Sequence, residues 1–459
     1  MSLYFTARGH GVDRSDANGW TPLHFAVDMG RSAAIERLLA KGAPLDARTA
    51  MGQTPLNIAE DNRDDAMTTL LAKHGARHTP PAFPSLRGDY LGQTRPGRTA
   101  VVFAPGIVSA RYQAHSNIAF SPDGRTAMWS VMNPPRGVGY SGGRTLVSKL
   151  ENGRWTYPVR ALVAGIEVED CPFTLPDGNA LYDMANRQLP GGVATQKETI
   201  WSWKKEGKRW TAPKPLPGVI NDVPQHWQFS VDRKGSLYFG TTLAGTAGGT
   251  DIYVSRLVKG EYQKPEALGA AINTPEAEAQ PFITPDGRTL LLARGMDIYA
   301  SFLAPSGAWT PAQKLGPEVN TRDMEILPTL SPDGKVLFFS RAWALFWIDA
   351  SVVEDARAVA LSRIGKESAT PSIERLVRSG DLETAHARFA AIRGEEAGAF
   401  FVDESELIAL GYALIRERKL AEAKAVFAMA AEAFPASWNA WDSLGEACAL
   451  ANDYAAAKA

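Results

Sequence analysis

The 459-residue chain has only two cysteines, no excess charge of one sign and no long apolar run. Cys171 and Cys448 fall in different predicted domains, so no disulfide between them is expected, and two cysteines do not fix a redox compartment. The 49 basic and 50 acidic residues are interspersed, which argues against binding to nucleic acid or to an anionic membrane surface. No stretch approaches the ~18 apolar residues of a membrane span, and residues 2–9 lack the apolar core of a signal peptide.

Instead, the sequence repeats one hairpin signature five times. A Phe-Ser-Pro-Asp-Gly-like segment precedes an apolar, aromatic-rich segment in each case, and the turn glycines recur at intervals of 54, 57, 52 and 47 positions. A period in this range, built from strand, tight turn and strand, is typical of a β-propeller. The five turn glycines are Gly124, Gly178, Gly235, Gly287 and Gly334.

Two more strands are predicted in each unit. Segments such as Asp251-Ile-Tyr253 and Asp297-Ile-Tyr299 indicate a third strand, and aromatic residues after a glycine turn indicate a fourth. The fifth unit stops after its third strand, and the segment Ala100-Val-Val-Phe-Ala104 could fill the missing place and close the ring. We therefore predict a five-bladed propeller over residues 98–353, with six blades as the alternative. The aromatic residues assigned to fourth strands are Trp155, Trp210, Tyr262 and Trp309.

This middle segment resembles the bacterial TolB-type (WD40-like, Pro-Asp repeat) propellers. The resemblance rests on Tyr90-Leu-Gly-Gln-Thr-Arg-Pro-Gly97, Phe103-Ala-Pro-Gly-Ile107, the Pro-Asp-Gly hairpins and Gly249-Thr-Asp-Ile-Tyr253, and it covers more than half of the chain. It implies a binding scaffold, often in the periplasm or cell envelope, and seldom an enzyme. The compartment has no other support in the sequence.

Residues 1–78 carry a repeat with a period of 33 positions. Asn18-Gly-Trp-Thr-Pro-Leu-His24 matches Met51-Gly-Gln-Thr-Pro-Leu-Asn57, a pattern that resembles the ankyrin repeat. Thr21 is predicted to cap a helix, Gly42 and Gly75 to end helices in a left-handed conformation, and His24 to bond a neighbouring repeat rather than a metal. Residues 1–13 read as the tail of an earlier repeat, so either the short array packs on the propeller or an upstream portion is missing. The second alternative is the favoured one.

A Pro-rich linker, residues 79–97, is predicted to be extended. Residues 354–459 repeat every 34 positions and resemble tetratricopeptide repeats, because Leu410-Gly411 recurs as Leu444-Gly445, with Ala423, Phe427 and Pro435 at the expected places. The last repeat stops part-way at the end of the sequence. The predicted fold class is therefore a multidomain repeat protein: ankyrin segment, all-β propeller and α-helical tetratricopeptide segment.

One constellation could carry chemistry. The residue nine positions before each turn glycine is His or Glu, and if the Asp-Gly turn ends the innermost strand, these five side chains form a ring at the channel mouth. Such a ring could bind a divalent cation, a cationic ligand or a sugar. The favoured alternative is architectural, with each glutamate accepting hydrogen bonds from backbone N–H groups. The ring consists of His115, Glu169, His226, Glu278 and Glu325.

Other motifs are assigned structural roles. The hairpin aspartates Asp123, Asp177, Asp286 and Asp333 suit an Asp-Gly turn. Ser141 lies in a G-x-S-x-G match that lacks the strand-turn-helix context of a nucleophile. The remaining histidines, His10, His74, His78 and His386, show no metal-ligand spacing.

The sequence thus favours a non-enzymatic interaction scaffold. The helical repeats would bind proteins or peptides, and the propeller funnel would bind a small ligand, glycan or peptide. No cofactor is expected apart from a possible divalent cation at the channel mouth. The alternative is a propeller glycoside hydrolase or metal-dependent hydrolase that uses Glu169, Glu278 and Glu325, in which the carboxyl separation would distinguish retaining from inverting chemistry.

Overall fold

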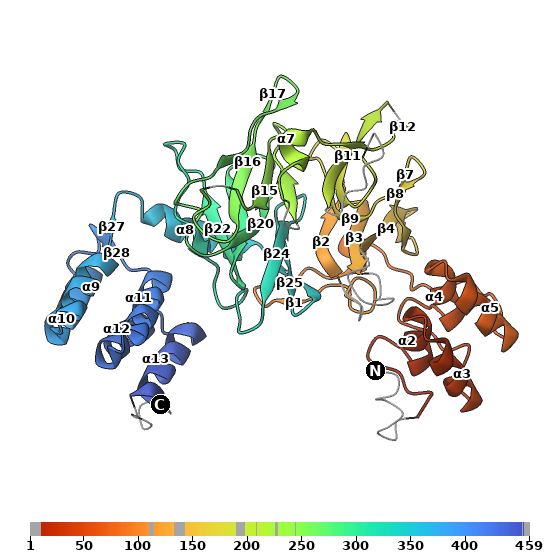
Figure 1. Cartoon of the computed structure of the whole chain (residues 1–459), viewed down its shortest axis with the longest axis horizontal. Coiled ribbons are helices and arrows are strands. Elements are labelled where there is room, and N and C mark those ends of the chain that lie inside the picture. Colours follow the sequence, from red (N-terminus) through yellow and green to blue (C-terminus); the bar gives the residue numbers. More distant parts are fainter. Residues whose placement is uncertain are drawn as a thin grey trace. The chain divides into compact units, whose positions relative to one another are not determined.

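A computed structural model describes residues 11–109, 114–132, 143–189, 198–207, 209–224, 228–243, 245–451 and 453 (Figure 1). The chain divides into two compact units. One comprises Met1–Ile298 with Asp323–Ser351, and the other comprises Tyr299–Arg322 with Val352–Ala459. The first unit holds the ankyrin repeats and most of the propeller, and the second holds the C-terminal helices.

The N-terminal helices form two pairs, α2 (Pro22–Asp28) with α3 (Ser32–Ala40) and α4 (Pro55–Asp61) with α5 (Asp65–Lys73). The predicted cap is confirmed, because the Thr21 hydroxyl accepts the His24 N–H, and the His24 ring closes the capping box by accepting the Thr21 N–H. Gly42 and Gly75 have φ of +81° and +95°, as predicted for helix ends.

His24 also joins the two repeats. Its Nε2 lies 3.2 Å from the carbonyl oxygen of Gln53 in the next repeat, as the sequence predicts. The side chain is fully buried, and burial lowers the pKa of His24 to about 4. The imidazole is therefore neutral at pH 7 and acts as a structural hydrogen-bonding group.

Five antiparallel sheets follow, and each is built outward from an inner strand. The inner strand pairs with the second strand through the Asp-Gly hairpin, and the second pairs with the third. The inner strands are β2 (Ala114–Phe120), β9 (Asp170–Thr174), β14 (Phe229–Val231), β20 (Glu278–Ile283) and β24 (Glu325–Leu330). The second strands are β3 (Thr126–Met132), β10 (Ala180–Ala185), β15 (Leu237–Thr241), β21 (Thr289–Arg294) and β25 (Val336–Arg341).

The third strands contain the segments that the sequence assigns to them, and the fourth-strand prediction is confirmed for Trp155 and Trp210, whose strands pair with the third strand. Trp309 lies in an isolated bridge with Leu303. Trp155, Trp210 and Tyr262 lie in short strands, β5 (Arg154–Trp155), β12 (Arg209–Trp210) and β18 (Glu261–Tyr262). β5 and β12 pair with the end of a third strand, and β18 pairs with β17 (Leu257–Val258). The third strands are β4 (Gly143–Glu151), β11 (Thr199–Glu206), β16 (Asp251–Ser255), β22 (Asp297–Phe302) and β26 (Ala344–Asp349). In the first two sheets the third strand pairs with two short outer strands, β5 and β6 (Val159–Arg160) in one and β12 and β13 (Lys214–Pro215) in the other. In the next two sheets the fourth strands are β19 (Glu266–Ala267) and β23 (Gln313–Lys314).

The five inner strands close into a ring, which confirms a five-bladed propeller. Each contacts the next in the order β2, β9, β14, β20 and β24, and β24 contacts β2. The fifth blade takes its outer strand from the chain that precedes the first blade, since β1 (Val101–Val102) pairs with β26. The predicted closing strand is thus confirmed, and it covers the middle of the β26 edge.

The seam between the fifth and first blades has an aromatic core. The Phe103 ring is fully buried and lies edge-on to Phe338 and Trp347 of the fifth blade, with centroids 5.1 and 4.9 Å away. It also lies edge-on to Phe120 of the first blade at 6.5 Å. One side chain from outside the blades therefore joins both sides of the seam.

The Pro-rich linker packs on folded elements instead of spanning open solvent. Its Ala82 N–H donates to Gly52 O of the ankyrin segment (3.1 Å), and the Gly88 carbonyl accepts from Trp155 Nε1 of the first blade (2.7 Å). Tyr90 donates its hydroxyl to Asp333 of the fifth blade (2.9 Å). Tyr90 and Leu91 both have positive φ, a strained conformation that these contacts hold in place.

The ankyrin segment packs on the propeller, the alternative that the sequence favoured less. Met51, in the turn before α4, belongs to the same buried cluster as Phe103. The Tyr157 hydroxyl donates to Asp61 (2.7 Å), and Arg144 donates to Asn62. The ankyrin helices keep a hydrophobic cluster of their own, and Met51 joins the ankyrin segment to the core at the blade seam.

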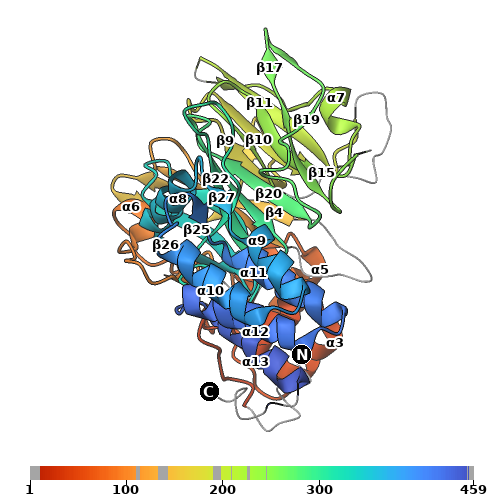
Figure 2. The same cartoon turned by 90° about the vertical axis from the view of Figure 1, so that its left-hand side faces the viewer.

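Helix α8 (Ser351–Ser362) leads into the C-terminal unit, which holds five further helices within the described residues. These are α9 (Thr370–Arg378), α10 (Leu382–Arg393), α11 (Glu404–Arg416), α12 (Leu420–Ala433) and α13 (Trp438–Leu450), and β27 (Glu367–Ser368) pairs with β28 (Phe400–Phe401). α9 packs on α10, α11 packs on α12, and α12 packs on α13 (Figure 2). Gly411 faces the Phe427 ring so closely that an added Cβ would lie 2.3 Å from it, so only glycine fits there.

Three short elements complete the described part of the chain: α6 (Asp89–Gly92), α7 (Gly218–Asn221) and the hairpin of β7 (Leu162–Val163) with β8 (Ile166–Glu167). Among the helices in the described residues, none is both long and apolar enough to cross a bilayer.

Candidate functional site

Three of the five ring residues can be placed with their side chains. Glu278 and Glu325 are the first residues of β20 and β24, and Glu169 directly precedes β9. All three therefore lie at the end of the inner strand opposite the Asp-Gly hairpin. His115 lies in β2 but its side chain is outside the described residues, as is the whole of His226.

Glu278 and Glu325 form buried ion pairs inside their own blades. Glu278 Oε1 lies 2.8 Å from Arg294 Nε, and Glu325 Oε1 lies 2.7 Å from Arg341 Nε. The side chains of both glutamates are 0% exposed. The pairs form because each glutamate lies directly opposite its arginine in the strand register, so that both side chains point to the same face.

Backbone and hydroxyl donors hold Glu278 further. Its second oxygen accepts the Thr274 N–H (3.0 Å), and Oε1 accepts the Thr274 hydroxyl. Burial raises the pKa of Glu278, although Thr274 and Arg294 oppose the shift. The Glu278 carboxylate thus connects Thr274, in the segment that leads into the fourth blade, with Arg294 on the second strand of that blade.

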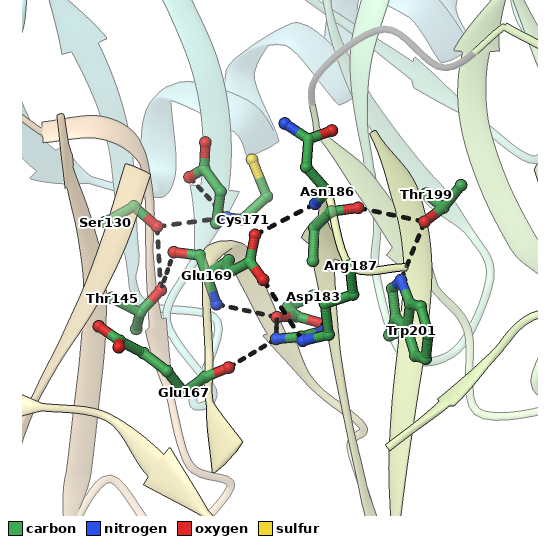
Figure 3. A network of polar contacts seen from close by, with 12 residues as sticks. Ser130, Thr145, Glu167, Glu169, Cys171, Asp183, Asn186, Arg187, Thr199 and Trp201 are labelled. Atoms are coloured by element: carbon green, nitrogen blue, oxygen red, sulfur yellow. Dashed lines mark hydrogen bonds and ion pairs between the residues drawn. The ribbon is translucent and has the colours of Figure 1, made fainter. Parts of the chain in front are cut away.

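The second blade has a different arrangement (Figure 3). Arg187 donates two hydrogen bonds to Asp183, at 2.9 and 2.7 Å, and one to the Glu167 carbonyl at 2.6 Å. Its Nε lies 3.4 Å from Glu169 Oε1, and the other Glu169 oxygen accepts the Asn186 N–H at 3.1 Å. Asp183, and not the ring glutamate, is therefore the main partner of this arginine.

Exposure separates Glu169 from the other two glutamates. The Glu169 side chain is 35% exposed, whereas Asp183 is fully buried and the buried site raises its pKa to about 6. Arg187 also lies over the rings of Trp201 and Trp203, with its guanidinium carbon 5.5 and 4.8 Å from their centroids. Among the described ring residues, Glu169 alone has a carboxylate that a ligand at the mouth can reach.

Side chains of the inner strands form hydrogen bonds between blades next to the ring. Gln280 Oε1 accepts the Leu327 N–H (3.1 Å), and Gln228 Nε2 donates to the carbonyl of Pro328 (2.9 Å), which belongs to a non-adjacent blade. Cys171, Gln280 and Leu327, each two residues after a ring glutamate, have φ of +47°, +57° and +57°. The inner strands of these three blades each carry a register shift near this point.

The hairpin aspartates bond within their own turns, as predicted. Asp123 accepts the Ser121 hydroxyl (2.6 Å) and the Arg125 N–H (3.0 Å), and these bonds lower its pKa. The Asp177, Asp286 and Asp333 carboxylates each accept the N–H two residues later. These carboxylates therefore stabilise turns.

The other candidate residues take no part in a cluster. His74, His78 and His386 each lie within 3.4 Å of one glutamate at the surface, and Ser141 and His10 fall outside the described residues. Within the described ranges, no group of three or more His, Cys, Asp or Glu side chains is placed to hold a metal ion.

Sequence reasoning missed the arginines at the mouth. Arg294 and Arg341 each lie 16 positions after their glutamate, and this constant spacing could have revealed them. Arg187 lies 18 positions after Glu169, so the second blade already departs from the pattern in the sequence. The departure corresponds to the blade in which the ring glutamate is exposed.

The comparisons with known proteins support the ankyrin assignment. A family model described as "Ankyrin repeats (3 copies)" matches residues 2–81, which confirms the ankyrin segment. No curated protein sequence matches the chain.

Solved propeller structures match about half of the chain at low similarity. A putative TolB from Agrobacterium tumefaciens is 17% identical over 51% of this chain and 70% of its own, with a TM-score of 0.32. A periplasmic gluconolactonase from Pseudomonas aeruginosa is 15% identical over 49% of this chain and 64% of its own, with a TM-score of 0.31. A gluconolactonase from Xanthomonas campestris is 11% identical over 59% of this chain and 98% of its own, with a TM-score of 0.33.

Proposed function

We propose that the protein is a non-enzymatic interaction scaffold. Its ankyrin and C-terminal helical repeats bind protein partners, and the mouth of its propeller binds a small ligand, glycan or peptide. The domains assigned to these roles are residues 1–78, 98–353 and 354–459, with residues 79–97 as the connection. Repeat arrays bring surfaces for binding and no chemistry of their own.

This proposal rests on the burial and ion pairing of the glutamate carboxylates at the mouth. A hydrolase of the glycosidase type needs two accessible carboxyl groups at a fixed separation. Glu278 and Glu325 are fully buried and each is held by an arginine within hydrogen-bonding distance. An ion pair of this kind stabilises a blade, and it keeps both carboxylates from a substrate.

The second candidate function, a hydrolase, has one observation in its favour. Glu169 is partly exposed at the mouth, and its neighbour Arg187 could polarise a bound oxygen. This leaves a single accessible carboxylate among the described ring residues, so the hydrolase would require a second group from outside them.

Hydrolysis assays distinguish the two functions. Wild-type protein incubated with chromogenic lactones, aryl esters and aryl glycosides, with and without Mg²⁺, Ca²⁺ or Zn²⁺, is expected to give rates equal to those of buffer. Glu169→Gln is expected to give the same rates and an unchanged melting temperature. The control variant is Glu151→Gln, which removes an exposed carboxylate on β4. The scaffold proposal fails if wild-type protein hydrolyses a substrate and this activity is lost in Glu169→Gln but kept in Glu151→Gln.

We further propose that α9–α13 are tetratricopeptide repeats. Leu410-Gly411 in α11 recurs as Leu444-Gly445 at the equivalent place in α13. The close approach of Gly411 to Phe427 supports this assignment, because such arrays need a small residue where paired helices meet. A groove between such helices would suit an extended peptide or a helix.

A further inference from the structure

The end of the channel opposite the mouth holds a cavity, which we call the hairpin pit. It has a volume of about 240 Å³, and all five blades contribute to its wall. Its wall contains the aromatic and aliphatic residues at the ends of the inner strands and the hairpin residues that follow them. Members of the wall include Phe120, Phe173, Val231, Phe282 and Leu330.

One position in the wall breaks the five-fold pattern. The residue two places before the turn glycine lines the pit in every blade, and it is proline in four of them. In the third blade it is Arg233. At this position the pit therefore carries four proline rings and one guanidinium group.

The backbone explains part of this exception. The Arg233 N–H donates to the carbonyl of Pro285 (2.9 Å), a bond that proline cannot make. Any other residue would supply the same N–H, so the bond does not account for the arginine side chain. That side chain is exposed, and within the described residues it has no hydrogen bond or ion pair.

In the described part of the chain, no carboxylate forms an ion pair with the Arg233 side chain. Asp232 is buried, and its carboxylate accepts the N–H groups of Lys234 and Ser236 inside the turn. The other hairpin aspartates are likewise bonded within their own turns. Thr174, on the adjacent second blade, also lines the pit, and its hydroxyl has no hydrogen-bond partner among the described residues.

We propose that the hairpin pit binds a small carboxylate with an apolar body, such as an arylalkanoate. The phenylalanine and proline side chains would cover the ring or chain, and Arg233 would bind the carboxylate through charge-assisted hydrogen bonds. The volume lies below the ~300–1,000 Å³ of pockets for drug-sized ligands, which limits the body to about one ring. The inference goes beyond the proposed function, because it concerns the opposite end of the channel.

Titration of 3-phenylpropionate, followed by ligand-observed NMR and calorimetry on the full chain, tests the proposal. Wild-type protein is expected to bind it, and Arg233→Gln is expected to weaken binding roughly tenfold, the loss of one charge-assisted contact. The matched control Arg288→Gln removes an exposed hairpin arginine that does not line the pit, and it should bind like wild type. The neutral analogue 3-phenylpropanol should bind wild type as weakly as the acid binds Arg233→Gln.

Three results would overturn the proposal: no binding of the acid to wild type at millimolar concentration, equal affinity of wild type and Arg233→Gln, or equal loss in Arg288→Gln. Both arginines are exposed, so both variants should keep the wild-type melting temperature. Failure here would leave the scaffold proposal intact, since that proposal depends on the mouth and the helical repeats.

Discussion

Replacing Arg341 with methionine is expected to lower the free energy of unfolding by about 3–5 kcal/mol. The change leaves the Glu325 carboxylate buried without its cation, and a buried charge that loses its partner is costly. Denaturant unfolding followed by tryptophan fluorescence measures the loss, since Trp347 lies in the same blade.

Two controls show whether the loss comes from the unpaired charge. The double variant Glu325→Gln with Arg341→Met removes both charges and should recover much of the stability. Arg256→Met breaks an exposed pair with Glu266, 3.6 Å apart, and should cost no more than ~1 kcal/mol. A loss in Arg341→Met as small as that in Arg256→Met would contradict the architectural role of the ring glutamates.

The second large effect is expected at the seam. Phe103→Ala should cost about 3–5 kcal/mol, because it removes a fully buried ring that contacts both the first and the fifth blades. The loss should appear in the same unfolding experiment as a lower transition midpoint. Phe103→Ala should also raise amide hydrogen exchange in β26, because Val101 and Val102, which precede Phe103, pair with the edge of that strand.

Val101→Ala is the matched control for this position. Val101 lies two residues away on the same closing segment but is 44% exposed, so its truncation should change stability little. Equal losses for Phe103→Ala and Val101→Ala would show that the aromatic core does not hold the seam.

Local turn chemistry explains why the propeller could be predicted from the sequence. Asp-Gly turns are specified within a few residues, so the period of Gly124 and its equivalents indicated the number of blades and the direction of each inner strand. The same spacing placed Glu278 and Glu325 correctly at the start of inner strands.

The partners of the ring glutamates required information that is not local. Whether Arg294 faces Glu278 depends on the register across a bulged strand pair, and a shift of one residue would turn the side chain to the other face. In the second blade, Arg187 lies beyond the strand and bonds Asp183, so Glu169 keeps an exposed carboxylate. No repeat pattern predicts that difference.

The contacts of the connecting segments could not be predicted from the sequence either. Proline predicts that the linker is extended, but composition does not say on what it packs. The Tyr90–Asp333 hydrogen bond joins residues 243 positions apart, and the contact of Met51 with the propeller core joins two repeat arrays with different periods. Such contacts depend on the assembled surfaces.

Both candidate sites require a closed ring, and a designed disulfide tests the closure most directly. Val102 lies opposite Phe346, and because the neighbouring Phe103 N–H donates to Leu345 O, the pair is of the closer, non-hydrogen-bonded kind that suits a disulfide. The native Cys171 and Cys448 are buried and free. The double variant Val102→Cys with Phe346→Cys should form the 102–346 disulfide in mild oxidant, seen by peptide mass mapping. Two freely alkylated thiols at these positions in the folded protein would contradict the ring.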